Sequence, residues 1–340
     1  MKKLPYVIML YLIAFTSNAQ NDLDALLGAG VENAERFAND FLRPGANGAM
    51  HSMNANWFNT ADVKPLGGFE ISIIANASVI KNEHKSFLMN IADYNNPSDD
   101  FAVEFAEGAD AQRVSTALGE NNNDIDIIVS SKSNPLLTDR ITLPNGLGDL
   151  GFLPTAFIQG ALGLSKGLEI KARLLPKLNA DDIEGSMFGV GLQAEFTKWL
   201  PADKILPVAL SGLVAYTNLD ARYDLTKSSG INGDNQRVEN TTKTWLFQFI
   251  ASTKLPIINF YGGLGYISGD SKSNVLGTYV VTNGIIDSEP IVDPFSVSSK
   301  VSSVRGTIGT KLKLGFFRLN AEYHLSNFNA LSLGINFGFR

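Results

Sequence analysis

The chain from Val304 to Arg340 alternates apolar and polar side chains almost without interruption. In the segment Phe317–Leu325 the odd-numbered residues are apolar and the even-numbered residues are polar or charged, and the segment from Leu331 to Phe339 repeats this pattern. Because successive side chains of a β-strand point to opposite faces, each segment predicts a strand with one apolar and one polar face. A soluble β-sandwich and a membrane β-barrel both use such strands.

The N-terminus predicts a secretory signal peptide at residues 1–19. Lys2 and Lys3 precede an apolar stretch from Leu4 to Phe15, which is too short to cross a bilayer as a helix. Small residues before Gln20 predict cleavage at that point, and a buried N-terminal helix is the alternative. An exported chain with alternating strands favours a protein of the bacterial outer membrane.

The composition excludes several kinds of partner and site. The chain has 28 basic and 34 acidic residues, and loss of Lys2 and Lys3 with the signal peptide changes the formal net charge from −6 to −8, which argues against a nucleic-acid partner. There is no cysteine, and His51, His84 and His324 form no metal-binding motif, so neither a metal nor a cofactor is expected. No apolar run after the signal peptide is long enough for a membrane helix.

The mature chain is expected to begin with an amphipathic helix over Asn21–Leu42, ended by Pro44-Gly45. Residues 20–66 are predicted to form this helix and a plug-like segment, ahead of a barrel formed by residues 67–340. The helix has an excess of acidic residues, so we expect it to lie inside the barrel or at its periplasmic mouth, with its acids toward a basic inner wall. A periplasmic appendage outside the barrel is the alternative.

The rest of the chain predicts an all-β fold, a transmembrane antiparallel up-and-down β-barrel. Strands are expected at Phe69–Val79 and at about Phe87–Tyr94, whereas residues 95–149 are ambiguous apart from two short candidates at Phe101–Phe105 and Ile125–Val129. Nine more strands are expected between Thr155 and Arg340. Because barrels close with an even number of strands, the total is expected to be about 12, with 14 as the alternative.

Short and long connections alternate along the predicted barrel. Tight turns are expected at Lys166-Gly167 and Leu255-Pro256, and long polar loops at Thr226–Lys243 and Gly269–Ser303. Outer-membrane barrels place short turns in the periplasm and long loops outside the cell, which predicts the orientation of this chain.

The polar face of each predicted strand supplies candidates for the lining of the lumen. They carry charges of both signs, which suits a polar pore as well as a blocked, salt-bridged interior. The candidates are Glu169, Lys171, Arg173, Gln193, Glu195, Arg305, Lys311, Lys313, Arg318, Glu322 and His324.

No catalytic motif is evident, and the protein is not expected to be an enzyme. Glu322 and His324 lie on one face of their strand, where they could orient a catalytic base, but a lumenal polar network is the favoured interpretation. Asp181, Asp182 and Glu184 could bind a divalent cation, although a solvated acidic loop explains them better.

Several short motifs resemble an uncharacterised family of outer-membrane proteins of the Bacteroidota and, more distantly, the long-chain fatty-acid transporter barrels. They are Phe41-Leu42-Arg43-Pro44, Asn54-Ala55-Asn56-Trp57-Phe58-Asn59-Thr60-Ala61, Leu66-Gly67-Gly68-Phe69-Glu70 and Thr197-Lys198-Trp199-Leu200-Pro201. The resemblance implies an N-terminal segment that plugs the barrel and transport of a hydrophobic compound. The expected function is therefore a channel or transporter for small, hydrophobic compounds, and the alternative is a closed structural or surface-binding barrel that acts through its extracellular loops. Outer-membrane lipid, the barrel-assembly machinery and a small hydrophobic ligand or detergent in the lumen are the expected partners.

Overall fold

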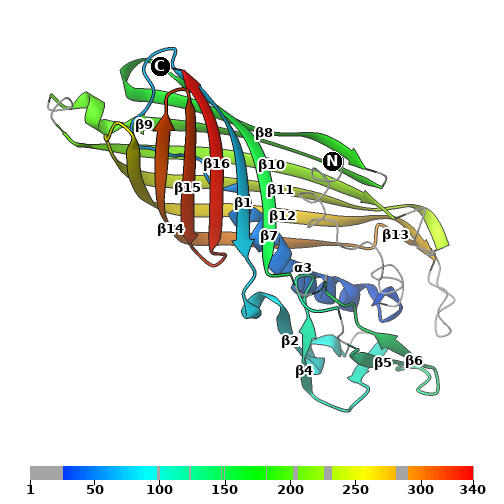
Figure 1. Ribbon diagram of the computed structural model, residues 1–340. Coiled ribbons are helices and arrows are strands. Elements are labelled where there is room, and N and C mark those ends of the chain that lie inside the picture. The colour runs from blue at the N-terminus through cyan, green and yellow to red at the C-terminus, as the bar shows by residue number, and fades with distance from the viewer. Residues whose placement is uncertain are drawn as a thin grey trace.

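A ring of ten antiparallel strands forms the body of the protein (Figure 1). The computed structural model describes residues 26–339 apart from residues 98–99, 122–123, 147, 149, 181, 202–205, 226–231 and 281–289. The ring closes where the first strand pairs with the last, from Phe69 opposite Phe339 to Ser78 opposite Ala330. The predicted signal peptide lies outside the described residues.

Each barrel strand pairs with its neighbours in chain order, and the short strand β13 (Ile291–Val292) is added to the side of β12. The ten strands are β1 (Phe69–Val79), β7 (Phe152–Gly163), β8 (Leu168–Ala180), β9 (Ile183–Glu195), β10 (Val208–Asp224), β11 (Asn232–Thr253), β12 (Ile258–Val280), β14 (Phe295–Leu314), β15 (Phe317–Leu325) and β16 (Ala330–Phe339).

The prediction of about 12 strands is wrong, although the nine strands expected from Thr155 onward are present. Only β1 precedes them in the barrel, because residues 80–151, here called the cap, fold separately beyond one end of it (Figure 1). The cap strands have only five or six residues each, whereas a membrane strand needs about ten. They are β2 (Ser86–Asn90), β3 (Phe101–Phe105), β4 (Ala111–Ser115), β5 (Asp126–Ser131) and β6 (Thr138–Thr142), with the short 3-10 helices η2 (Asn82–His84) and η3 (Ile91–Tyr94).

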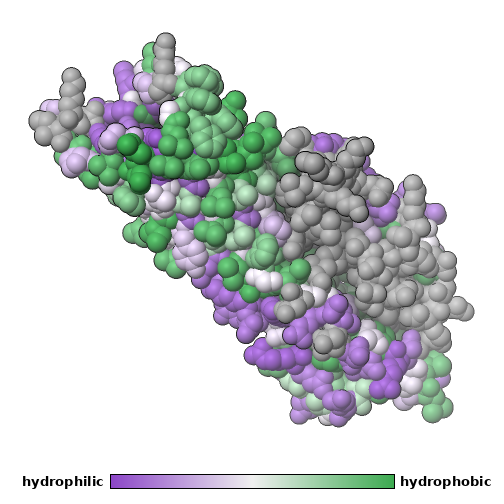
Figure 2. Space-filling model, viewed as in Figure 1, coloured by the Kyte–Doolittle hydropathy of each residue, from purple (hydrophilic) through white to green (hydrophobic). Residues whose placement is uncertain are grey.

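The barrel is apolar outside and polar inside, as the alternation predicts. Along β16 every second residue is exposed, and these residues include Leu331 and Phe337, whereas Ser332 and Asn336 between them are buried. Figure 2 shows hydrophobic residues gathered over the barrel wall and hydrophilic residues toward the cap. No helix among the described residues is long and apolar enough to cross a membrane, a test that does not concern β-barrels.

Tight connections lie at the end of the barrel opposite the cap, here called the turn end, together with the C-terminus (Figure 1). The 3-10 helices η4 (Ser165–Gly167) and η5 (Phe196–Trp199) begin two of them. Lys166 lies in the left-handed region, with φ of 61°, as a tight turn requires.

The prediction that Thr226–Lys243 and Gly269–Ser303 are long loops is wrong. Most of these residues extend β11, β12 and β14 far beyond the apolar part of the wall on the cap side. On β14 the exposed residues change from Ser298 and Lys300 to Val304 and Ile308, which marks where the apolar outer band begins. Strands that leave the membrane need no apolar face toward lipid, so their sequence looks like that of a loop.

The N-terminal helix differs from its prediction. The helix α3 spans Val31–Met53 and contains Pro44 and Gly45, which were expected to end it. Proline lacks an amide donor and destabilises the interior of a helix. Packing against the barrel and the cap must therefore stabilise α3 through Pro44. Phe37, Phe41 and Met50 of α3 are all buried against the barrel or the cap.

We expect Ala321→Arg on β15 to lower the free energy of unfolding by roughly 2–4 kcal/mol, because Ala321 faces outward in the apolar band and an arginine there would meet lipid. Urea titration of the protein refolded into vesicles measures this loss. Ser298→Arg is the matched control, since Ser298 faces outward above the band and its replacement should change little. Equal losses in the two variants would contradict the assigned outer face.

Candidate functional site

Residues 26–66, here called the plug, run through the barrel from the cap end to the turn end. At the cap end, Phe37 and Phe41 of α3 pack with Leu225 and Phe295 from the strand ends. Trp57 and Phe58 lie farther along, against inward side chains of β10, β11 and β12. At the turn end the amide of Gly67 donates to the carbonyl of Gly163 at 3.0 Å. The lumen is therefore occupied along its length.

Two buried arginines of the wall hold the end of α3. Arg173 of β8 donates to the carbonyls of Met53 at 2.9 Å and Ala55 at 2.8 Å. Arg305 of β14 donates to the carbonyl of Asn54 at 2.7 Å. The last carbonyls of a helix have no partner within it, and irregular backbone inside a barrel must be satisfied by the protein. These arginines supply the missing donors.

Trp57 occupies a recess in the wall that only glycine can provide. Its side chain is 1% exposed, and a Cβ atom on Gly189 or Gly191 of β9 would lie 2.9 or 3.1 Å from the indole. The guanidinium of Arg173 lies 4.2 Å from the centre of the indole ring and 4.6 Å from that of Phe157. Arg173 thus forms cation–π contacts with the plug and with β7.

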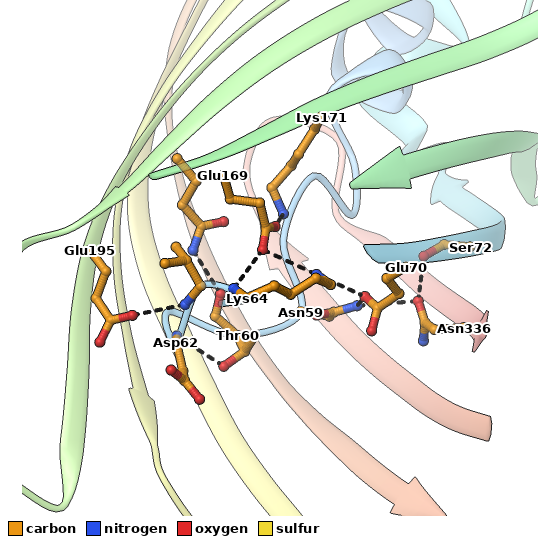
Figure 3. Close-up of polar contacts among 12 residues, drawn as sticks. Asn59, Thr60, Asp62, Lys64, Glu70, Ser72, Glu169, Lys171, Glu195 and Asn336 are labelled. Atoms are coloured by element: carbon orange, nitrogen blue, oxygen red, sulfur yellow. Dashed lines mark hydrogen bonds and ion pairs between the residues drawn. The ribbon is translucent and has the colours of Figure 1, made fainter. Parts of the chain in front are cut away.

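Two wall carboxylates bind the backbone at the other end of the plug (Figure 3). Glu195 accepts the amide of Val63 at 2.8 Å, and Glu169 accepts the amide of Lys64 at 3.0 Å and its ammonium at 3.1 Å. Gln193 donates to the carbonyl of Thr60 at 3.0 Å. Hydrogen bonds to ionised groups are stronger than neutral ones, so this end is firmly held.

Glu70 at the start of β1 is the centre of a buried charge network (Figure 3). It accepts Asn59 of the plug at 2.9 Å, Lys311 at 3.1 Å and Arg318 at 2.7 Å. Lys171 adds an ion pair with Glu169 at 2.7 Å. Glu70 and Glu169 therefore balance several cations without bulk water, and loss of one carboxylate would leave buried positive charge.

The remaining candidates, Glu322, His324 and Lys313, bind other residues of the wall. His324 and Glu322 form a buried pair at 2.8 Å, with Thr307 at 3.0 Å on the other ring nitrogen of the histidine. Lys313 is only half-buried and donates to the carbonyl of Leu255 at 3.4 Å at the turn end. The buried candidates are Glu169, Lys171, Arg173, Gln193, Glu195, Arg305, Lys311, Glu322 and His324.

The expected pairing between the acids of the helix and the basic wall is wrong for the described residues, and Asp22 and Asp24 lie outside them. Glu32 and Glu35 are exposed, and Asp40 pairs with Arg43 of the same helix. Lys311 and Arg318 pair instead with Glu70, which the sequence interpretation missed. Glu70 occupies an inward position in the alternation of its strand, and that signal could have identified it.

The acidic cluster considered as a cation site is not supported by the described residues. Glu184 pairs with Lys177 at 2.9 Å, and Asp181 lies outside the described residues. Within the part of the chain that is described, no group of histidine, aspartate and glutamate side chains is arranged to hold a metal ion.

An apolar cavity lies at the cap end, between α3, Leu225 just after β10, and the inner faces of β11, β12 and β14. Its cavity volume is about 50 Å³. Of the described residues that line it, only Ser273 has a polar side chain. The apolar lining includes Leu26, Phe37, Phe41, Leu225, Val275 and Phe295. Such a cavity can contact a ligand through dispersion forces and burial of apolar area, with almost no polar anchoring.

The sequence pattern of one protein family, described as a family of unknown function (DUF6588), matches residues 1–339. The chain belongs to DUF6588. None of the curated proteins matches it. The DUF6588 chain is similar in structure to the β domain of the Bordetella autotransporter BrkA, with 12% identity over 81% of this chain and 100% of that one, and a TM-score of 0.38.

Two further similar structures are bacterial proteins of different kinds. Ail, the attachment invasion locus protein of Yersinia pestis, has 12% identity over 81% of the DUF6588 chain and 99% of Ail, with a TM-score of 0.28. OccAB1 of Acinetobacter baumannii has 9% identity over 82% and 99%, with a TM-score of 0.22. Similarities this low say nothing about substrate or mechanism.

Proposed function

We propose that this DUF6588 protein is an outer-membrane transporter for small apolar compounds, with a plugged lumen. The apolar cavity between α3 and the strands β11, β12 and β14 supports this proposal most directly. Pockets for small molecules are concave and mostly apolar, and this one opens where the long polar strand extensions and the cap surround the barrel mouth. The plug is bonded to the wall at Glu195 and, through the network around Glu70, at Lys311, so free passage of ions or sugars is not part of the proposal.

The proposal includes the remaining expectations from the sequence. The chain is exported by a cleaved signal peptide, assembled by the barrel-assembly machinery and surrounded by outer-membrane lipid, and it catalyses no reaction. An origin in the Bacteroidota and a distant likeness to the long-chain fatty-acid transporters are part of the same proposal.

The alternative function is a closed, surface-binding barrel that acts through its extracellular parts. The cap supports this alternative, because Leu136 is 91% exposed and Leu88 is 64% exposed. Exposed apolar residues on a module outside the membrane are typical of a surface that meets another molecule.

We expect the purified protein in detergent to bind a soluble fluorescent alkyl probe saturably, and Ala38→Phe to weaken that binding at least several-fold. Ala38 lines the cavity from α3, and a phenyl ring would occupy part of the space. Ala92→Phe on the exposed surface of the cap is the matched control and should bind as the native protein does. Absence of saturable binding, or equal binding by both variants, would favour the surface-binding barrel.

A further inference from the structure

Three lysines lie close together on the outer face of the wall, on the cap side of the apolar band. Lys243 of β11 and Lys300 of β14 lie opposite Asp270 of β12, one on each side of it. Lys272 is the next outward residue of β12 toward the cap. All four side chains are exposed. Because neighbouring strands lie about 4.8 Å apart, Lys243 and Lys300 face outward about 10 Å from each other.

The ammonium groups of these three lysines, here called the lysine group, are free. Lys177 of β8 pairs with Glu184 at 2.9 Å, but no member of the lysine group forms an ion pair with another residue that the structure describes. Asp220, the other acid on this face, already accepts hydrogen bonds from Asn218 and Thr241. Three lysines against two aspartates leave an excess of positive charge, and the ammonium groups are available to an anion.

The residues next to the lysine group on the membrane side indicate the level of the lipid headgroups. Trp245 is the next outward residue after Lys243 on β11, and its ring packs against that of Tyr216 with centres 5.0 Å apart. The hydroxyls of Tyr266 and Ser302 lie 2.7 Å apart. Tryptophan and tyrosine are enriched where acyl chains meet headgroups, on both faces of outer-membrane barrels. The lysine group therefore lies at the level of the headgroups.

An apolar hollow in the outer wall adjoins this aromatic belt on the membrane side. Its volume is about 660 Å³, and Tyr266 belongs to its lining as well as to the belt. Phe247 also lines it and lies four residues from Lys243 on β11, which is about 13 Å along a strand. The other outward residues that line it include Leu192, Val214, Phe249, Leu264 and Val304.

We propose that the hollow and the lysine group together bind a phosphorylated glycolipid of the outer leaflet. One acyl chain of the lipid lies in the hollow, and the phosphates of its sugar headgroup accept hydrogen bonds from the lysines. Hydrogen bonds between ammonium and phosphate are charge-assisted and therefore strong. Asp270, between Lys243 and Lys300, can accept a hydroxyl of the sugar. The inference goes beyond transport and requires only that the cap side faces out of the cell.

The charge of the lysine group favours a lipid over a second copy of the chain. Two copies in one membrane have the same orientation, so contact through this face would bring the lysines of both copies to the same level. Like charges placed together oppose association. A phosphorylated lipid instead supplies the opposite charge at the headgroup level and an apolar chain at the level of the hollow.

Native mass spectrometry of the full chain refolded in detergent tests this site. The refolded protein carries no lipid, and lipid A, phosphatidylglycerol and phosphatidylethanolamine are added in separate samples at the same molar excess. We expect lipid A to remain bound at a collision energy that removes both phospholipids. Phosphatidylglycerol controls for attraction of any anionic lipid, and phosphatidylethanolamine controls for attraction of any acyl chain.

Loss of the lysine group should lower the bound fraction of lipid A at least several-fold. The variant is Lys243→Gln with Lys272→Gln and Lys300→Gln. The matched control removes three lysines elsewhere on the cap side, as Lys85→Gln with Lys132→Gln and Lys177→Gln. Because the two variants have the same net charge, nonspecific attraction of an anionic lipid would fall equally in both.

Filling the hollow should also lower the bound fraction of lipid A several-fold. Val214→Trp places an indole ring in the hollow, where Val214 is part of the lining. Val190→Trp is the matched control, because Val190 faces outward from β9 at 50% exposure and does not belong to the described lining of the hollow. Both valines face the membrane, so neither change alters the lumen.

Three results would overturn the proposal. Lipid A would bind no more strongly than phosphatidylglycerol, or the two lysine variants would lose lipid A equally. A dimer of the native chain that Val214→Trp disrupts would identify the hollow as an interface between copies instead. Failure of the proposed function is a separate result, since it appears as lost saturable binding of the alkyl probe in the Ala38→Phe experiment, which uses no lipid A.

Discussion

Glu70→Gln should lower the free energy of unfolding by roughly 3–5 kcal/mol, the usual range when one partner of a buried ion pair is removed. Glu70 is 2% exposed and lies within 3.1 Å of donors from Asn59, Lys311 and Arg318. Glutamine keeps the size of the side chain but removes its charge, so Lys311 and Arg318 lose their common anion. Urea titration of the refolded protein in vesicles measures the loss.

Glu184→Gln is the control for this prediction. Glu184 also pairs with a lysine, Lys177, but the two side chains are 45% and 60% exposed. Exposed ion pairs contribute at most about 1 kcal/mol, so the variant should be nearly as stable as the native protein. A second variant, Glu70→Gln with Lys311→Met, should regain part of the stability because it removes one uncompensated charge. If Glu70→Gln and Glu184→Gln lost similar free energy of unfolding, water would have to screen the charges around Glu70 despite their burial.

Acidification from pH 7 to pH 4 should loosen the packing of α3 against the cap. Burial, with smaller effects of Arg305, His84 and Lys81, lowers the pKa of His51 from 6.5 to about 4. The pKa of His84 is also lowered, chiefly by burial. Both rings pack on Phe328, with ring centres 5.7 Å away for His51 and 3.8 Å away for His84.

The sign of the effect follows from proton binding. His51 stays neutral in the folded protein until about pH 4, whereas in the unfolded chain it takes up a proton near pH 6.5. The unfolded state therefore binds more protons between these values, and stability falls as the pH falls through this interval, by roughly 3 kcal/mol in total. The contribution is fully present above pH 6.5.

His51→Gln isolates this contribution, because glutamine does not titrate. We expect the native protein to lose more stability than the variant between pH 7 and pH 4, and hydrogen exchange in α3 to accelerate more in the native protein. Carboxylates elsewhere titrate in both proteins and cancel in the comparison. Parallel pH profiles for the two proteins would contradict the role assigned to His51.

The barrel itself could be predicted from the sequence because its strands carry a period-two pattern that a bilayer imposes. The position of Leu331 or Ser332 on its strand already determines which face it occupies. The cap could not be separated from the barrel in this way. Phe101–Phe105 alternates as a barrel strand does, and only its length and its pairing with β5 place it outside the wall.

The period-two pattern also predicts that Arg173 and Glu169 point inward. It does not predict which groups they bind. Arg173 binds backbone carbonyls of Met53 and Ala55, and a carbonyl leaves no trace in a sequence. The continuation of α3 through Pro44 is similar, since the local signal favours a stop and the surrounding packing overrides it. The contacts between the wall and the plug could be identified only from the structure, because they depend on where the plug lies.

The plug imposes an order on how the protein can be built. β1 and β16 come from opposite ends of the chain, and their pairing is the step that joins the wall into a ring. The plug leads directly into β1 at the turn end, while its other end is packed at the cap end, so it would have to be drawn through the finished ring if it arrived late. Pairing between strands as distant in sequence as β1 and β16 is slow to form. The plug therefore has time to pack against the other strands before the ring closes. A wall that closed too early would enclose Glu169, Arg173 and Arg305 without the backbone groups they bind, and the ring is therefore expected to form last, around a segment already in place.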